Sequence, residues 1–513
     1  MRWPDALRAA IAPFVLAGCV SSSIDYAPSS ADRPWHPATD ASGAIVPSRS
    51  TAAGGDRGGD WTLPGNPALA NVPAPPALDA EHAYTLPELI DIAQSSHPET
   101  RIAWDQARHA ALAAGIAASS YLPHLSAAVI NGHRHVTGPQ SVQGENVDQS
   151  FSANGTLSAL NLEWLVFDFG QRDAVVEAAR EVSVASNIAF TGAHQRVIHA
   201  VCIAYYVHAA AQAHVRSAEQ ALKNAQDVEA AADDRKRRGV GTVIDVAQAR
   251  QATAQARLAQ VQATGAAQDA YQSLVAAMGV SPLTKLKVAD LSQRPLSAST
   301  ARSVDRIVAD ALSRRPDVLG AYAAEKASAA GIRAAEADFK PKIFLSAIGA
   351  YNSGRLGLTG IPSAGGLPPT FNVSGNQWSN TILFGFVVPL YDAGLRDSRL
   401  RQARVEADKA QATSERIREE AVRQIVAAQN AVETSIAAHE ASKALETAAR
   451  TTYDAALDAY RHGVGTVTAV SVAATQLLAA TDATSDAYSS ALAAAATLAF
   501  ATGSLGSAPR DGP

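Results

Sequence analysis

Histidine and cysteine are the residues in this sequence whose side chains could support catalysis or bind a metal. His133 and His135 flank Arg134 on a predicted strand, and four further histidines in one predicted helix lack the i, i+4 spacing of a zinc pair. These four are His194, His199, His208 and His214. The sequence also has no Gly-x-Ser-x-Gly elbow, no Walker phosphate loop and no Cys-x-x-Cys pair. We therefore expect no catalysis, no metal site and no cofactor.

The two cysteines have different predicted roles. Cys19 follows Leu16-Ala17-Gly18, two arginines and a short apolar run, and this pattern resembles a bacterial lipoprotein signal peptide. Residues 1–18 would then be removed, and acyl chains on Cys19 would anchor the mature chain; Val20, being a residue other than aspartate, favours the outer membrane in that resemblance. An ordinary secretory signal with an incidental cysteine is the alternative. Cys202 shares one helical face with apolar neighbours, which favours core packing.

Composition restricts the partners of the chain. The net charge is -5, and because long basic runs are absent we expect no nucleic acid partner. No stretch of strongly apolar residues is long enough for a helical membrane span. Residues 19–82 are rich in Pro, Ser, Gly and Asp, so we expect a lipidated extended N-terminal tether rather than a folded domain.

The second half of the chain repeats the first. Pro98 and Pro123 recur with equal spacing as Pro316 and Pro341, and FDFGQRD at 167–173 recurs as YDAGLRD at 391–397. The offset of this second match also relates the Gly-Val-Gly-Thr at 239–242 to the one at 463–466, which indicates a duplicated rigid element. The predicted divisions are a signal peptide 1–18, the tether 19–82, a first repeat 83–290, a second repeat 300–503 and a C-terminal tail 504–513.

Proline spacing predicts a helical hairpin in each repeat. Prolines are absent from 171–281 and from 395–507, and good helix formers dominate both stretches. Each stretch predicts one arm of about 68 residues, a reversal at Gly-Val-Gly-Thr and a return arm of about 37 residues. At 1.5 Å per residue the first arm would be on the order of 100 Å long. The paired glycines would allow the tight reversal.

Each repeat also has segments of period two. Alternating apolar residues in TLSALNLEWLVF and TILFGFVV, together with 125–136 and 343–351, predict two strand pairs. The polar segments 137–154 and 352–379 are predicted to be the loops that join them. Strands of about 9 to about 11 residues suit a membrane, although a small soluble sheet is the alternative. Four strands cannot close a barrel, so the membrane interpretation requires several chains.

The duplicated order of strand pair and helical hairpin resembles the TolC-like outer-membrane efflux proteins, over residues 83–503. The resemblance implies a fold that is mainly α with a membrane β part: a long α-helical hairpin barrel plus a trimeric 12-stranded β-barrel, with four strands per chain and two internal repeats. A lipidated N-terminus resembles the branch that works with resistance-nodulation-division pumps.

The resemblance also implies function and partners. A homotrimer would sit in the bacterial outer membrane with its helical part in the periplasm. It would act as the passive exit duct of a tripartite efflux system, conducting small molecules from a periplasmic membrane fusion (adaptor) protein and an inner-membrane transporter to the outside. The alternatives are the outer-membrane component of a type I protein secretion system, or a periplasmic coiled-coil scaffold without a pore.

Three groups of site residues follow from the resemblance. The adaptor-docking tips are Gly239, Val240, Gly241, Thr242, Gly463, Val464, Gly465 and Thr466. The periplasmic gate candidates are Arg237, Asp245, Tyr460 and Arg461. The strand-to-helix junctions are Asp168, Gly170 and Arg172, and Asp392, Gly394 and Arg396. This sequence departs from the family at two gate positions, because Lys236 replaces a tyrosine and Ala469 replaces an acid.

Overall fold

The computed structural model describes residues 31–32, 35, 38–46, 61–63, 65–70, 78–142, 145–291, 296, 304–354 and 376–506. Cys19 and the predicted signal peptide lie outside these residues, as does the predicted tail from 507 on. The chain divides into two compact units, Met1–Leu78 and Asp79–Pro513.

The described part of the first unit contains short elements. Strands β1 (Ala38–Thr39) and β2 (Ile45–Val46) pair antiparallel. The side chain of Asp40 closes the turn between them by accepting hydrogen bonds from the backbone N–H groups of Ser42 and Ala44. A 3-10 turn, η3 (Pro67–Leu69), begins at an Asn66 cap.

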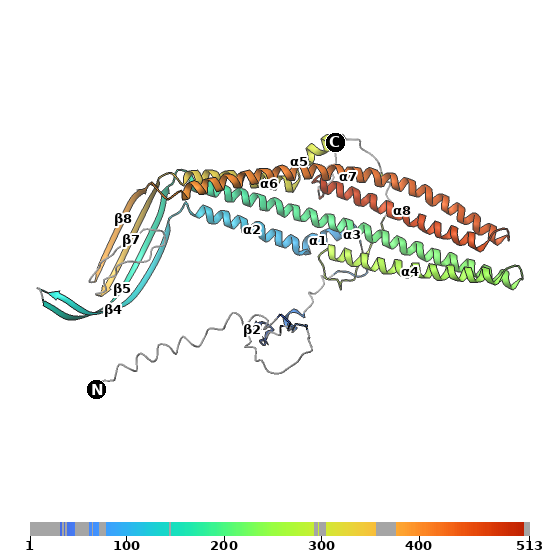
Figure 1. The fold of residues 1–513 in the computed structure, drawn as a ribbon, viewed down its shortest axis with the longest axis horizontal. Helices are drawn as coiled ribbons and strands as arrows, with labels where there is room; N and C mark the ends of the chain where they lie inside the picture. The colour runs from blue at the N-terminus through green and yellow to red at the C-terminus, as the bar shows by residue number, and fades with distance from the viewer. Residues whose placement is uncertain are drawn as a thin grey trace, which may run out of the picture. The chain divides into compact units, whose positions relative to one another are not determined.

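The second unit contains two copies of one arrangement of short helices, a strand pair and a long helical hairpin (Figure 1). The first copy comprises α1 (Leu86–Ser96), α2 (Pro98–Ser119), β4 (His124–Val142), β5 (Glu145–Phe167), α3 (Gln171–Arg237) and α4 (Val243–Ala277). The second comprises α5 (Val304–Leu312), α6 (Pro316–Ala337), β7 (Lys342–Gly354), β8 (Gln377–Val387), α7 (Leu395–Arg461) and α8 (Val467–Ala501). Strand β3 (Ala83–Tyr84), which precedes the first copy, pairs in parallel with β6 (Lys287–Val288), which follows it.

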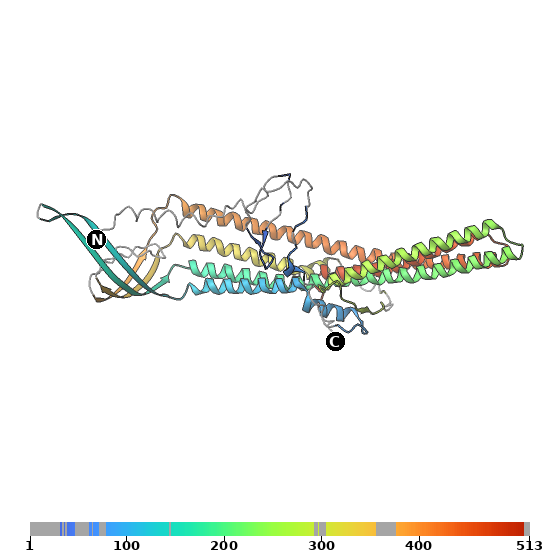
Figure 2. The same ribbon diagram turned by 90° about the horizontal axis from the view of Figure 1, so that it is seen from below.

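The predicted hairpins are confirmed in both copies. Helices α3 and α7 each have 67 residues, and their return helices α4 and α8 each have 35. Within this unit the two hairpins end at the same side, opposite the strands (Figure 2). None of the helices that the structure describes combines the length and apolarity needed to cross a membrane.

Alanine lets the long helices pack closely. Helix α3 lies between α2 and α6, α6 also contacts α7, and each long helix packs on its own return helix. Many side chains buried along these contacts are alanines, which allow two backbones to approach without a thick layer of side chains. Examples are Ala218, Ala232, Ala249, Ala267, Ala421, Ala428, Ala473 and Ala480.

The four long strands form one antiparallel sheet in the order β4-β5-β7-β8. The predicted strand pairs are therefore confirmed, but the interpretation of 137–154 as a loop was wrong. The ladder continues from His124↔Glu163 to Val142↔Glu145, because backbone pairing does not require apolar side chains and Gly, Ser and Asn can continue it. In the second pair the strands extend to Gly354 and begin again at Gln377, and residues 355–375 lie outside the described part.

Strand register places most of the large apolar side chains of the sheet on one face. Residues directly opposite each other in an antiparallel pair point to the same side. One face therefore carries Leu125, Val129, Leu160, Leu162, Trp164, Ile343, Leu345, Ile382, Phe384 and Phe386. The other face carries polar residues such as Asn161 and Glu163 among fewer apolar ones. The predicted alternation in the second strand of each pair is thus confirmed.

Candidate functional site

Both hairpin tips end their first helix in the same hydrogen-bonded turn. Gly239 has φ +77° and Gly463 has φ +85°, which is the left-handed conformation that glycine adopts readily. The N–H of Val240 donates to Arg235 O, and the N–H of Val464 donates to Ala459 O, both at 3.0 Å. The N–H of Gly239 donates to Lys236 O, and the N–H of Gly463 donates to Tyr460 O. Each tip is therefore a Schellman motif, which satisfies the last carbonyls of its helix.

The second glycine of each tip is required for a different reason. Neither Gly241 nor Gly465 has a positive φ. A Cβ at Gly241 would come within 2.9 Å of Lys236 N, and one at Gly465 within 2.9 Å of Tyr460 N. Any side chain there would collide with the backbone of the preceding helix. The first glycine of each tip therefore supplies the left-handed conformation, and the second allows the chain to pass close to that helix.

The threonines start the return helices. Thr242 and Asp245 form a reciprocal capping box, in which the Asp245 carboxylate accepts from Thr242 N at 2.9 Å. These hydrogen bonds from Thr242 lower the pKa of Asp245. In the second tip Thr466 accepts from Ala469 N at 3.2 Å. Because Ala469 has no carboxylate, that cap is only half formed.

Each tip exposes the valine between its glycines. The side chains of Val240 and Val464 are 65% and 85% exposed. A small apolar side chain flanked by accessible glycine backbone can pack closely against another helical tip. The predicted docking residues therefore lie together at each tip, with the glycines and threonines shaping the turn and the valine presented to solvent.

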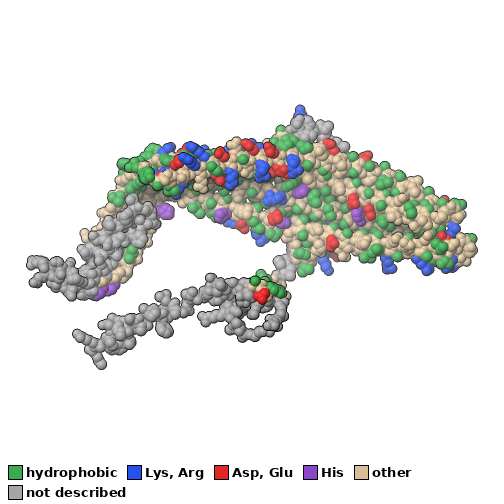
Figure 3. Space-filling view, in the orientation of Figure 1, with side chains coloured by type: hydrophobic (Ala, Val, Ile, Leu, Met, Phe, Trp, Pro, Cys, Tyr) green, Lys and Arg blue, Asp and Glu red, His purple; other side chains and the backbone are tan. Residues whose placement is uncertain are grey.

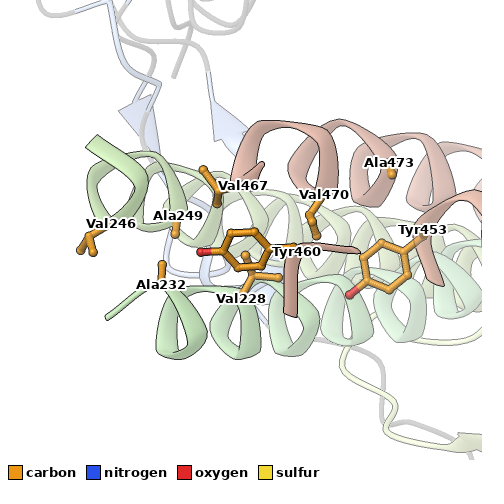
Figure 4. Close-up of a cluster of buried hydrophobic side chains, with 9 residues drawn as sticks. All are labelled: Val228, Ala232, Val246, Ala249, Tyr453, Tyr460, Val467, Val470 and Ala473. Carbon is orange, nitrogen blue, oxygen red and sulfur yellow. The ribbon is translucent and has the colours of Figure 1, made fainter. Parts of the chain in front are cut away.

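A buried cluster lies directly behind the tips and joins the two hairpins (Figure 4). It is built by side chains from all four long helices. The members are Val228, Ala232, Val246, Ala249, Tyr453, Tyr460, Val467, Val470 and Ala473. Tyr460 is 2% exposed, its hydroxyl has no hydrogen-bond partner among the described residues, and burial raises its pKa. Tyr460 thus packs within the chain rather than projecting from it.

The structure does not bring the four gate candidates into one polar group. Arg237 is exposed and pairs with Asp234 of its own helix. Asp245 is held by the capping box, Tyr460 is buried, and Arg461 is exposed at the second tip. Two of the four therefore have local roles that stabilise a turn or a core in this chain.

Arg235 is a residue at this end that sequence reasoning missed. Its guanidinium extends from the first hairpin to the second, where Nη1 donates to Tyr460 O at 2.6 Å. The same group lies 5.0 Å from the centroid of the Tyr460 ring, within cation–π range. The available signal was a break in the repeat, because the equivalent position of the second copy is Ala459.

The junction residues lie where a strand becomes a long helix. Asp168 accepts from the backbone N–H of Arg172 at 2.9 Å and from its Nε at 3.0 Å. Asp392 accepts from the backbone N–H of Arg396 at 3.1 Å, and the two side chains form an ion pair at 3.0 Å. The carboxylates also satisfy free N–H groups at the positive end of each helix dipole.

Backbone strain accompanies these junctions. Gly170 and Gly394 have positive φ, and so do the residues before them, Phe169 at 54° and Ala393 at 56°. L side chains rarely adopt that conformation. The hydrogen bonds of the two aspartates hold the turn in both copies.

Among the described residues, no group of three or more His, Cys, Asp or Glu side chains is arranged to hold a metal ion. The histidines of α3 pack instead: His199 stacks on Phe500, and His208 is buried near Tyr271. Cys202 is buried, as predicted, and burial raises the pKa of its thiol to about 11.

Comparison with known proteins assigns the duplicated architecture. The sequence matches the outer membrane efflux protein family twice, over residues 89–280 and 307–504. It is 30% identical over 280 residues to the Probable efflux pump outer membrane protein TtgC of Pseudomonas putida, covering 53% of this chain and 52% of that protein. It is 29% identical over 282 residues to Protein CyaE of Bordetella pertussis, covering 55% of this chain and 57% of that protein. The chain thus spans about half the length of the relatives it matches.

Solved structures share the fold. The outer-membrane channel OprN superposes with a TM-score of 0.68 at 20% identity, covering 83% of this chain and 94% of that one. The outer membrane protein VceC of Vibrio cholerae superposes with a TM-score of 0.67 at 22% identity, covering 82% and 96%. The expected mainly helical fold with two repeats is confirmed, and the matched family is one of efflux proteins and not of enzymes. With one family match for each repeat, together covering most of the chain, this protein belongs to the outer membrane efflux protein family.

Proposed function

We propose that this chain is the outer-membrane exit duct of a tripartite efflux system, passively conducting small molecules from a periplasmic adaptor and an inner-membrane pump to the outside. The observation that carries the proposal is the sheet, which exposes a large apolar face and leaves two edges unpaired. Within the described residues β4 pairs only with β5, and β8 pairs only with β7.

The apolar face extends along most of β8. Phe386 and Trp378 are eight residues apart on this strand, which at about 3.4 Å per residue is roughly 27 Å along the strand. Trp378, Ile382, Phe384 and Phe386 are each at least 73% exposed, which is unusual for a face in contact with water. The rings of Tyr351 and Trp378 lie with their centroids 4.9 Å apart at an interplanar angle of 43°, and aromatic residues are typical of membrane interfaces.

Open sheet edges cannot remain in lipid, because unpaired N–H and C=O groups have no water there. A homotrimer removes both edges if β8 of each copy pairs with β4 of the next, and four strands per copy then give a twelve-stranded wall. The space-filling view shows apolar side chains concentrated at this end of the unit, where the sheet meets the helices (Figure 3).

The hairpin tips are the proposed docking sites for the adaptor. The exposed Val240 and Val464, with glycine backbone on both sides, support this role. The relatives' names support the pump context, because TtgC and ArpC of Pseudomonas putida are named as outer membrane proteins of efflux pumps. We propose a transporter of the resistance-nodulation-division type as the source of energy.

The periplasmic gate is proposed to depend on contacts between the two hairpins. Arg235 and Tyr460 provide such a contact within each chain. Arg237, Asp245 and Arg461 remain candidates for contacts between chains, since each carries a charge near the tips. Separation of the hairpins would break the Arg235 hydrogen bond and expose the buried cluster behind it.

Planar bilayer recording tests the duct directly. We expect discrete single-channel conductance from a purified species of about three times 53.1 kDa, measured in detergent by light scattering. A monomer that never enters the bilayer would contradict the proposal and favour the scaffold alternative. In cells, deletion of the gene should lower resistance to small toxic compounds. Loss of a secreted polypeptide with unchanged resistance would favour the type I secretion alternative.

We propose lipid anchoring at Cys19 as part of the same function. The Cys19→Ser variant should lose incorporation of radiolabelled palmitate, because the thiol is the acylation site of the predicted signal. Trimer mass should be unchanged, since the anchor lies outside both repeats. Equal labelling of the variant and the wild type would show that Cys19 is not acylated.

A further inference from the structure

Four consecutive basic residues end the first long helix, and they have different surroundings. Arg235 extends to the second hairpin and donates to Tyr460 O, and Arg237 pairs with Asp234. Lys236 and Arg238 are exposed. Within the described part of the chain, no carboxylate lies within ion-pair distance of either of these two. Arg238 Nε donates to the backbone O of Asp234 at 3.4 Å. Among the described residues, the first tip therefore presents two exposed cations that form no ion pair, one of which contacts its own helix end.

The second tip lacks this feature although its backbone is the same. Residues 234–246 contain four cations and two carboxylates, a net charge of +2. The equivalent residues 458–470 contain one cation and one carboxylate, a net charge of 0 with His462 neutral. Figure 3 shows Lys and Arg side chains at the end of the α3–α4 hairpin. The two tips of one chain thus differ in charge. Val240 and Val464 are exposed in both tips, whereas Val243 is exposed and its counterpart Val467 is buried.

Stabilisation of the helix end does not account for the extra cations. Basic residues near a helix C-terminus interact favourably with its dipole. However, α7 reaches the same 67 residues and the same Schellman turn with Arg461 as the basic residue of its last turn. The first tip therefore carries more cations than an equivalent helix end requires. It also exposes two apolar side chains, Val240 at 65% and Val243 at 67%.

We propose that the first tip, defined by Lys236, Arg238 and Val240, is an electrostatic docking site for an acidic helical tip of the periplasmic partner, whereas the second tip docks through Val464 alone. The inference rests on the proposed function and specifies its partner. Opposite charges at the rim of an interface steer association and select the partner's register. In a trimer the two kinds of tip would alternate, so a partner ring would meet charged and neutral tips in turn.

Export by charge variants is the first test. The double variant Lys236→Glu/Arg238→Glu should reduce resistance about tenfold towards that of a deletion strain, and Lys236→Gln/Arg238→Gln should cause a smaller loss. The matched control is Lys223→Glu/Arg257→Glu. It makes the same change in net charge at exposed positions of α3 and α4 away from the tip, and it should export normally.

The duct and the docking charge can fail separately. Trimer mass should be unchanged in all three variants, because the proposed trimer closes through the strands and not through the tip cations. Normal export by the tip glutamate variant, with trimer mass intact, would overturn the inference and leave the proposed function standing. An equal loss in the control would also overturn it, since the effect would then follow net charge and not the tip.

Direct binding gives a second test with defined probes. The probes are two disulfide-closed helical hairpin peptides that differ only in carrying three glutamates or three lysines at the tip. The full-length trimer in detergent should bind the glutamate peptide about tenfold more tightly at low salt, and the difference should vanish near 1 M salt, where the Debye length is about 3 Å. Absence of that preference, or its persistence in Lys236→Gln/Arg238→Gln, would overturn the inference. The inference would also be overturned if phosphatidylglycerol vesicles bound through the same two residues and neither peptide was preferred. That result would identify a lipid surface as the partner.

Discussion

Replacing Val464 with aspartate should abolish export while the amount of assembled protein in the membrane stays unchanged. The side chain is 85% exposed and the backbone N–H keeps its bond to Ala459 O, so the fold loses no contact. At a docked tip, however, the new carboxylate would be buried without a partner, which is costly and displaces the apolar contact. Resistance of a strain carrying the variant should fall to that of the deletion strain.

The control for this experiment is Val261→Asp, which makes the same chemical change at a 64% exposed position of α4 away from the tip. We expect that variant to export normally. Conductance and trimer mass of the Val464 variant should equal those of the wild type. Wild-type resistance in the Val464→Asp strain would remove the docking role from this tip.

Arg172→Ala is expected to destabilise the protein by about 3 kcal/mol, because it breaks a buried ion pair. The side chains of Arg172 and Asp168 are only 12% and 6% exposed. The guanidinium also donates to the backbone carbonyls of Leu165 at 2.6 Å and Ser120 at 3.0 Å. Alanine would leave the Asp168 carboxylate without its counterion at a strained turn. The midpoint of urea unfolding, followed by circular dichroism of the detergent-solubilised protein, should fall accordingly.

The second copy of the repeat supplies a matched control for this prediction. Arg396 forms the equivalent pair with Asp392, but the two side chains are 24% and 22% exposed. Water can therefore solvate the carboxylate that remains, and Arg396→Ala should cost about 1 kcal/mol. Equal midpoints for Arg172→Ala and Arg396→Ala would show that burial of the first pair does not matter.

Much of the fold could be predicted because it depends on neighbours in the chain. Helix formers without proline predict the long arms, and the spacing of Gly463 and Gly465 predicts the reversal. The constant offset between the two halves predicts the duplication without any knowledge of packing. Asp168 and Asp392 could be placed at helix starts because a cap acts on backbone groups within a few residues.

The polar end of the β4–β5 pair was predicted wrongly for a physical reason. Strand prediction relied on alternating apolar side chains, and residues 137–154 have few of them. Backbone hydrogen bonds to a partner strand can continue where the side chains are polar. The length of a ladder therefore depends on the partner strand as well as on composition.

The sequence alone determined the two repeats, the four long helices, the tip residues and the alternation of the strands, since propensity, periodicity and glycine geometry act over short distances along the chain. Only the tertiary structure decided that Tyr460 is buried and that Arg235 joins the two hairpins. Arg235 and Tyr460 are 225 residues apart in the chain. Their contact exists because four helices pack together behind the tips, and side-chain burial in such a cluster depends on all four at once.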